Sequence, residues 1–308
     1  MIPSNNKKRE PAFSLTYVVL LVLFSGMIVL SLTGCDQRDS VNSVQEPTHP
    51  SFITNSEWRA VLASVSESSS PFSANPAING RIVSAVIPHH LTAARLISDV
   101  LQLLAPQKPD VIILIGPNHT NKGNPIITGT YGWQTPEGVV QTDPGIVDLL
   151  LSQHLAVKDE ETLSTEHAIG SLVPLIRHYL PDTRIVPIIL HHGVSRQEVE
   201  ALLDVLQPVL TERSVLMASV DFSHYLTRNE AQLKDQETLT YMKQFNYPAL
   251  FRLNSDYLDS PASLTAAFLL AQKQGINTFT LLENTNSGII MQNDTMETTS
   301  YFTMVFTE

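Results

Sequence analysis

The stretch VSAVIPHHLTAARLISDVLQLLAPQKPDVIILIGPNHT, residues 83–120, decides the fold. Two continuous apolar runs, residues 83–87 and 111–115, have the length and composition of buried strands. Between them, apolar residues at 93, 96, 97, 100, 101 and 104 recur with the spacing of one helix face, and Pro106 ends the pattern. A strand, a helix and a second strand in this order predict a parallel βαβ unit.

A histidine follows each predicted strand within a few residues, His89 after the first and His119 after the second. One crossover joins the two strands, so we expect them to be parallel and to be neighbours in the sheet. Their carboxyl ends then share one edge, which is where open α/β sheets bind ligands. Neutral imidazole is a ligand for iron, copper or zinc, so the pair predicts a metal site. The alternative is that both are ordinary loop residues.

Further strands alternate with helices along the rest of the chain. Apolar runs at 184–190, 215–219 and 301–306 have the composition of buried strands, and helical patterns separate them. This alternation predicts a three-layer α/β/α fold with a mostly parallel central sheet.

Residues 1–35 have the pattern of a bacterial lipoprotein signal peptide. Basic residues at 7–9 precede an apolar run over 15–32, and small residues then lead to Cys35, the only cysteine of the chain. We expect cleavage before Cys35 and lipidation of its thiol, because several acyl chains anchor a protein stably. The alternative is an uncleaved transmembrane helix, since the run approaches the length of a span.

Three segments follow from this interpretation: a signal over 1–35, a polar tether over 36–56 and one domain over 57–308. The predicted location is the bacterial cell envelope, outside the cytoplasm, with the membrane as partner through the lipid. Asp36 after the cysteine favours the inner membrane where there are two. A formal net charge of −11 argues against nucleic acid as a partner.

Six short motifs occur in order along the predicted domain. They are IPHH (87–90), IGPNHT (115–120), QTPEGVVQTD (134–143), EHAIGSLVPLI (166–176), IVPIIL (185–190) and SVDFSHY (219–225). In this combination the chain resembles the Memo-like family, the protein B component of the AmmeMemoRadiSam system. That family is similar in fold to class III extradiol ring-cleaving dioxygenases. The glycine and aromatic residue usual after the first histidine are replaced here by His90 and Leu91.

The resemblance selects His89 and His119 as metal ligands and leaves the third ligand open. Ring-cleaving relatives use a carboxylate at this point, and eukaryotic Memo proteins use a cysteine that this chain lacks. Asp259 is the first candidate, with Asp256 or water as alternatives. Asp259 precedes a predicted helix, so it is equally suited to capping that helix. His90 is a candidate for a supporting group or a fourth ligand.

Four further residues match the catalytic region of the family. Asp221 and His224 lie in SVDFSHY, where the resemblance makes His224 an acid or base and Asp221 its orienting partner. Glu166 and His167 begin EHAIGSLVPLI; as catalytic candidates, Glu166 is expected to act electrostatically and His167 to line the pocket. The alternative for Asp221 and Glu166 is that each caps a helix or turn.

Two classes of function remain open from the sequence. The first is a metal-dependent oxidoreductase that handles O₂ and a small substrate, with a divalent metal as cofactor, iron being favoured over copper or zinc. The second is a binding module that has kept the dioxygenase-like scaffold without the reaction. A metal-dependent hydrolase is a weaker third option, because an open metal site can also activate water.

Overall fold

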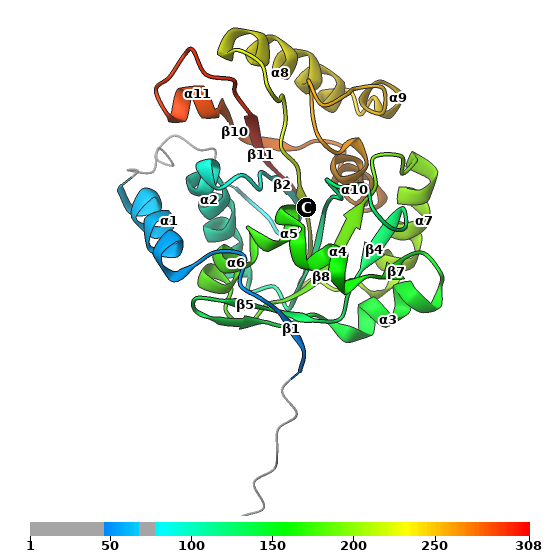
Figure 1. Cartoon of the computed structure of the whole chain (residues 1–308). Helices are drawn as coiled ribbons and strands as arrows, with labels where there is room; N and C mark the ends of the chain where they lie inside the picture. The colour runs from blue at the N-terminus through cyan, green and yellow to red at the C-terminus, as the bar shows by residue number, and fades with distance from the viewer. Residues whose placement is uncertain (1–45, 68–77) are drawn as a thin grey trace, which may run out of the picture. The chain divides into compact units, whose positions relative to one another are not determined.

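Eight strands form the central sheet of the protein, in the order β10-β11-β2-β9-β3-β8-β4-β7. The structure is a computed structural model that describes residues 46–67 and 78–308 (Figure 1). The strands are β2 (Ile82–Ile87), β3 (Val111–Pro117), β4 (Ile126–Thr128), β7 (Val157–Lys158), β8 (Arg184–Leu190), β9 (Ser214–Ser219), β10 (Thr280–Asn286) and β11 (Ser300–Thr307).

The four central strands β2, β9, β3 and β8 are parallel to one another. Antiparallel pairs occur only toward the edges, between β11 and β2, β10 and β11, and β4 and β8. A separate small sheet consists of β1 (Thr48–His49), β5 (Gly132–Thr135) and β6 (Gly138–Val140). The prediction of a mostly parallel central sheet is therefore confirmed.

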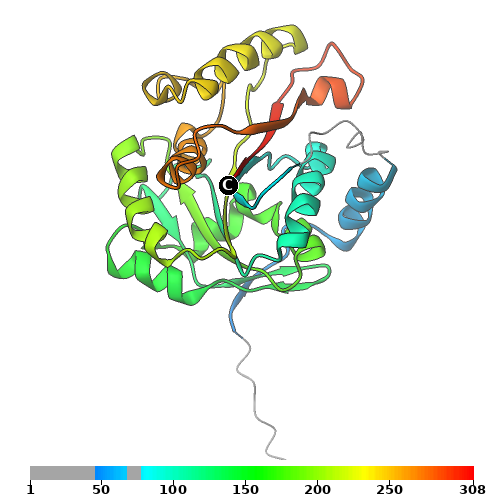
Figure 2. The same cartoon turned by 180° about the vertical axis from the view of Figure 1, so that it is seen from behind.

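Helices cover both faces of this sheet, and Figures 1 and 2 show the two groups on opposite sides. One group contains α1, α2 and α6, and the other contains α3, α7 and α10. The helices are α1 (Asn55–Glu67), α2 (Ala94–Leu104), α3 (Pro144–Ser152), α4 (Glu160–Thr165), α5 (His167–Gly170), α6 (Val173–Tyr179), α7 (Arg196–Leu206), α8 (Arg228–Lys243), α9 (Tyr247–Leu250), α10 (Pro261–Lys273) and α11 (Ser287–Ile290).

Alternate side chains of each strand enter different cores, as the two-residue period of a strand requires. In β3, Ile112 and Leu114 pack with α2 and α6, whereas Ile113 and Ile115 pack with α7 and α10. All four are fully buried. A strand buried on both faces must be apolar throughout, which explains the unbroken apolar runs of the sequence.

One expectation about the sheet is wrong. The strands β2 and β3 are parallel, but they are not neighbours, because β9 pairs with both and lies between them. A right-handed crossover fixes the relative direction of two strands but not the number of strand positions that it passes over. The strand in between comes from about a hundred residues later in the chain, so local sequence patterns cannot reveal it.

The part of the predicted tether that the structure describes belongs to the fold. Thr48 and His49 form β1, which pairs with β5, and Ile53 is buried. The predicted signal, Cys35 and the first part of the tether lie outside the described residues. Within residues 46–67 and 78–308, no helix is both long and apolar enough to cross a bilayer.

Candidate metal centre

Three histidines converge at the carboxyl edge of the central strands. His89 follows β2, His119 follows β3, and His167 is the first residue of α5. The ring centroid of His89 lies 5.1 Å from that of His119 and 5.2 Å from that of His167. The rings of His119 and His167 stack with their centroids 3.9 Å apart. One ligand nitrogen from each lies within 4.8 Å of the others, so they form a possible metal-binding cluster.

The ring of His89 has a fixed proton position. Its Nδ1 lies 2.9 Å from the hydroxyl of Ser219, and that hydroxyl donates its own hydrogen to the Ala168 carbonyl at 2.7 Å. Ser219 must therefore accept a hydrogen from Nδ1 of His89. This leaves the Nε2 of a neutral His89 with a free lone pair, which is the form that binds a metal.

Glu166 fixes His119 in the same way. Its Oε1 accepts a hydrogen bond from Nδ1 of His119 at 2.7 Å, and its Oε2 accepts one from the backbone N–H of His119 at 2.9 Å. The same carboxylate caps α5 by accepting from the backbone N–H of Ala168. Glu166 therefore caps α5 and contacts His119 at the same time, and Nε2 of His119 is left free for a ligand.

Asp259 faces both of these free nitrogens. Its Oδ2 lies 3.4 Å from Nε2 of His89 and 3.8 Å from Nε2 of His119. Its Oδ1 is buried and has no hydrogen-bond partner among the described residues. Asp259 does not cap α10, because the hydroxyl of Ser260 accepts from the Ser263 N–H and fills that role. The capping interpretation of Asp259 is therefore wrong.

Burial disfavours the charged forms of the ionisable residues in the cluster. It lowers the pKa of His89 well below the ordinary value, helped by His119 and His167, and it also lowers the pKa of His167. Burial, followed by the charge of Asp221, raises the pKa of Asp259 well above the ordinary value. Neutral imidazoles beside a carboxylate that needs a nearby cation are suited to a metal ion.

Asp221 and His224 lie beside the cluster. Oδ1 of Asp221 accepts the backbone N–H of His89 at 3.1 Å, and its Oδ2 lies 3.6 Å from Nε2 of the same residue. His224 is half-buried, and its Nδ1 donates to the Ser255 carbonyl at 3.2 Å. Burial lowers the pKa of His224, and the charge of Asp221 opposes this shift.

Two other candidates point elsewhere. His90 is exposed, and its Nδ1 forms a 2.8 Å hydrogen bond with the hydroxyl of the buried Tyr301. The backbone N–H of Asp256 donates to the Asn254 side chain. The negative charge of the Asp256 side chain helps to raise the pKa of Lys234. No contact of the Asp256 carboxylate with the three histidines is found among the described residues.

Close packing beneath the cluster depends on Gly116. A Cβ atom at this position would lie 2.9 Å from the Cβ of Ala168 and 3.3 Å from that of Ser219. The absence of a side chain lets α5 approach β3 and β9, which brings His167 and Glu166 to His119. Sequence reasoning missed the role of Ser219, although this residue opens the SVDFSHY motif.

Comparison with known proteins identifies the family of this chain. Residues 54–305 match the family described as Memo-like protein, and this range contains all six motifs. The chain belongs to the Memo-like family. Two members are the MEMO1 family proteins of Pyrobaculum arsenaticum and Methanosarcina barkeri. The first is 30% identical over 69% of this chain and 79% of its own length, and the second is 31% identical over 67% and 80%.

Among solved structures, the Memo-like chain is similar to the uncharacterized protein JW3007 from Escherichia coli K12. The two are 14% identical, and the match covers 72% of this chain and 99% of that one with a TM-score of 0.48.

Proposed function

We propose that this Memo-like protein binds one divalent metal ion through His89, His119 and Asp259, and that it acts as a metal-dependent oxidoreductase on a small substrate. The observation that carries the proposal is the meeting of two proton-free Nε2 atoms with one carboxylate oxygen. With the carboxylate ionised and no cation present, three lone pairs would face one another at this site. Ligand atoms about 2.0–2.2 Å from one ion lie roughly 3–3.5 Å apart, close to the distances found here.

The donor set favours iron over copper or zinc. Two histidines and one carboxylate on one side of an ion are the ligands of non-haem Fe(II) oxygenases. An ion held by these three residues would have open positions for O₂ and substrate. His167 lies close enough to fill a fourth position, and with 46% of its side chain exposed it faces solvent more than His89 does.

The surrounding residues would hold the ligands and handle protons. Ser219 and Glu166 keep the Nδ1 hydrogens of His89 and His119 in place, which directs both Nε2 atoms toward Asp259. His224 donates through Nδ1 to a backbone carbonyl, so its Nε2 is available to accept a proton from substrate. Asp221 supplies a negative charge that stabilises the protonated form of His224.

Metal analysis of the purified full-length protein tests the proposal. We expect about one equivalent of metal in the wild type and very little in His119→Ala, since a missing ligand removes the site. His154→Asn is the matched control, because His154 is exposed and has a positive φ of 56° that asparagine tolerates. Equal metal content in all three proteins would refute the metal site.

O₂ consumption by the metal-loaded protein separates the oxidoreductase from the binding module. Substrate-dependent uptake that is lost in both His119→Ala and His224→Ala supports the enzyme. Ligand binding without any O₂ uptake or product supports the module and refutes the proposed reaction.

We also propose that the protein is anchored in the bacterial cell envelope through lipidated Cys35. This proposal rests on residues 1–35 of the sequence alone. Mass spectrometry of the N-terminal peptide tests it, and an acylated cysteine at position 35 is the expected result. An intact, uncleaved N-terminus would refute it.

A further inference from the structure

A cavity of about 530 Å³ opens beside the metal centre. His119 and Asp259 belong to its wall, so a molecule in this cavity reaches the proposed ion. The remaining wall comes from the segments that follow β3, β8 and α9 and from the start of α10. A volume of this size is typical of small-molecule sites.

The body of the cavity is apolar. Leu190 and Leu258 are almost fully buried in its wall, and Phe251 and Leu253 are half-buried beside them. Pro261 adds a further, partly exposed apolar surface. The exposed parts of Phe251, Leu253 and Pro261 favour the apolar part of a ligand, because contact removes their apolar surface from water.

Two side-chain amides offer hydrogen-bond donors to a ligand. The Oδ1 of Asn121 accepts from the His192 N–H at 2.8 Å, and the Oδ1 of Asn254 accepts from the Asp256 N–H at 3.2 Å. Their amide nitrogens have no partner among the described residues, and both residues line the cavity. They are therefore free to donate to a carbonyl or hydroxyl oxygen.

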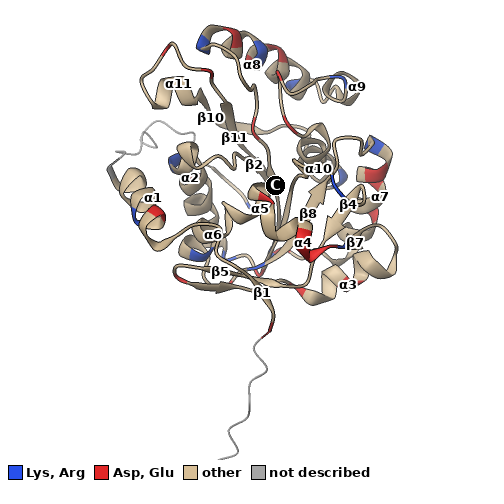
Figure 3. Ribbon diagram, viewed as in Figure 1, with Lys and Arg blue, Asp and Glu red and all other residues tan. Residues whose placement is uncertain are grey.

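The charge of the cavity disfavours anions. No lysine or arginine is found among its lining residues, all of which the structure describes. The cluster contains three carboxylates, those of Glu166, Asp221 and Asp259. A divalent ion offsets two of these three negative charges. The remaining negative charge repels a carboxylate on a ligand. Basic residues occur instead on outer helices such as α7 and α8, together with acidic residues (Figure 3).

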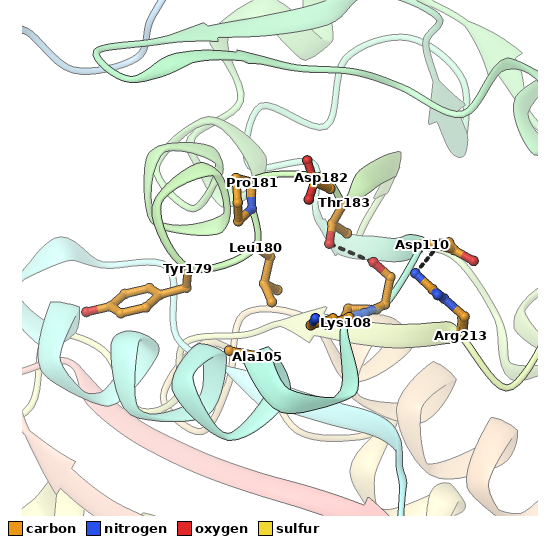
Figure 4. A pocket seen from close by; sticks show the side chains of 10 residues that line it. Ala105, Lys108, Asp110, Tyr179, Leu180, Pro181, Asp182, Thr183 and Arg213 are labelled. Atoms are coloured by element: carbon orange, nitrogen blue, oxygen red, sulfur yellow. Dashed lines mark hydrogen bonds and ion pairs between the residues drawn. The ribbon is translucent and has the colours of Figure 1, made fainter.

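A second cavity of about 260 Å³ provides the contrast. It lies at the opposite edge of the sheet, where β3 and β8 begin, and its wall contains Lys108 and Arg213 together with Asp110 and Asp182 (Figure 4). Arg213 forms an ion pair with Asp110 at 2.5 Å. This cavity has basic groups but no part in the histidine cluster, so it serves as the control position.

We infer that the ligand of the metal centre is an uncharged small molecule with an apolar body and an oxygen acceptor, and that the same cavity discriminates against carboxylates. The inference rests on the proposed metal centre. It adds the chemical class of the substrate and assigns Asn254 and Leu253 to specificity.

Benzamide and benzoate test this directly, since they have the same shape and differ by one charge. Both are titrated into full-length protein loaded with Zn²⁺, which is redox-silent, and binding is followed by ligand-observed NMR. We expect benzamide to bind about tenfold more tightly, the order of magnitude for a like charge at short range near a protein surface. Equal binding, tighter binding of benzoate, or no binding of benzamide would overturn the inference.

Three variants test which residues produce the preference for benzamide. Asn254→Lys adds a cation to an exposed wall position and should bring the two affinities to within about threefold of each other. Leu253→Trp fills the cavity and should abolish benzamide binding. Lys108→Ala changes only the second cavity and should leave both affinities unaltered. A preference that survives Asn254→Lys unchanged, or that moves in Lys108→Ala, would contradict the assignment.

Zinc content, measured in the same samples, separates a failure of the proposed metal centre from a failure of the proposed substrate class. Bound zinc without a preference for benzamide refutes the substrate class and leaves the metal centre intact. Failure of the wild type to bind zinc refutes the proposed function and the inference together.

Discussion

Replacing Glu166 with glutamine should weaken metal binding by 10–100-fold, the usual effect of losing a carboxylate that orients a histidine ligand. The two oxygens of Glu166 accept three N–H groups, two from His119 and one from Ala168. Glutamine has one oxygen, so its NH₂ must face at least one of these donors. The expected loss in binding free energy is about 1.4–2.7 kcal/mol. A buried donor left unpaired should also lower the free energy of unfolding by about 1–3 kcal/mol.

Competition with a chromophoric chelator measures the affinity for Zn²⁺, and urea unfolding measures the stability. Glu137→Gln is the matched control, because Glu137 also contacts a histidine, His178 at 3.0 Å, but lies away from the cluster. A folded Glu166→Gln protein whose zinc affinity stays within about twofold of the wild type would refute the role given to this carboxylate.

Three other predictions follow from the same structure and sequence. His224→Ala should keep its metal and lose turnover or ligand binding, and metal loss as complete as in His119→Ala would make His224 a ligand. Burial raises the pKa of Glu160, but the neighbouring His49 ring, 3.1 Å from Oε2, and two hydrogen bonds from Thr130 outweigh it and lower this pKa from its usual 4.5 to about 2. The resulting stabilisation, about 1–2 kcal/mol after solvent screening, should be present at neutral pH and lost as the pH falls through this range, whereas Glu160→Gln should lack this pH dependence in urea unfolding. Cys35→Ala should no longer carry acyl chains, and a variant processed and anchored like the wild type would contradict lipidation.

Local sequence patterns were sufficient to predict that His89 and His119 lie close together. The apolar runs that end at His89 and His119 are local patterns, and the common edge of parallel strands brings their ends together whatever lies between them. The position of β9 between them was not predictable, because strand order depends on contacts between distant segments. The short strands β1 and β5 were missed for a related reason, since two to four residues carry no readable period.

The supporting contacts of the site depend on packing that only the three-dimensional structure shows. Glu166 and His167 were recognised through family motifs, but their approach to His119 depends on the glycine at 116 and on a break between α4 and α5. Ser219 looked like the last residue of a strand, and its hydroxyl fixes the His89 ring through a buried hydrogen bond. Whether Asp259 faced the site or capped a helix was decided by the neighbouring Ser260, which takes the cap.

Element-specific anomalous diffraction from crystals of the metal-loaded protein tests the central claim most directly. We predict one peak about 2.0–2.2 Å from Nε2 of His89, from Nε2 of His119 and from a carboxylate oxygen of Asp259. A loaded crystal without a peak between these three side chains, or with the ion held by residues that exclude His89 and His119, would contradict the account.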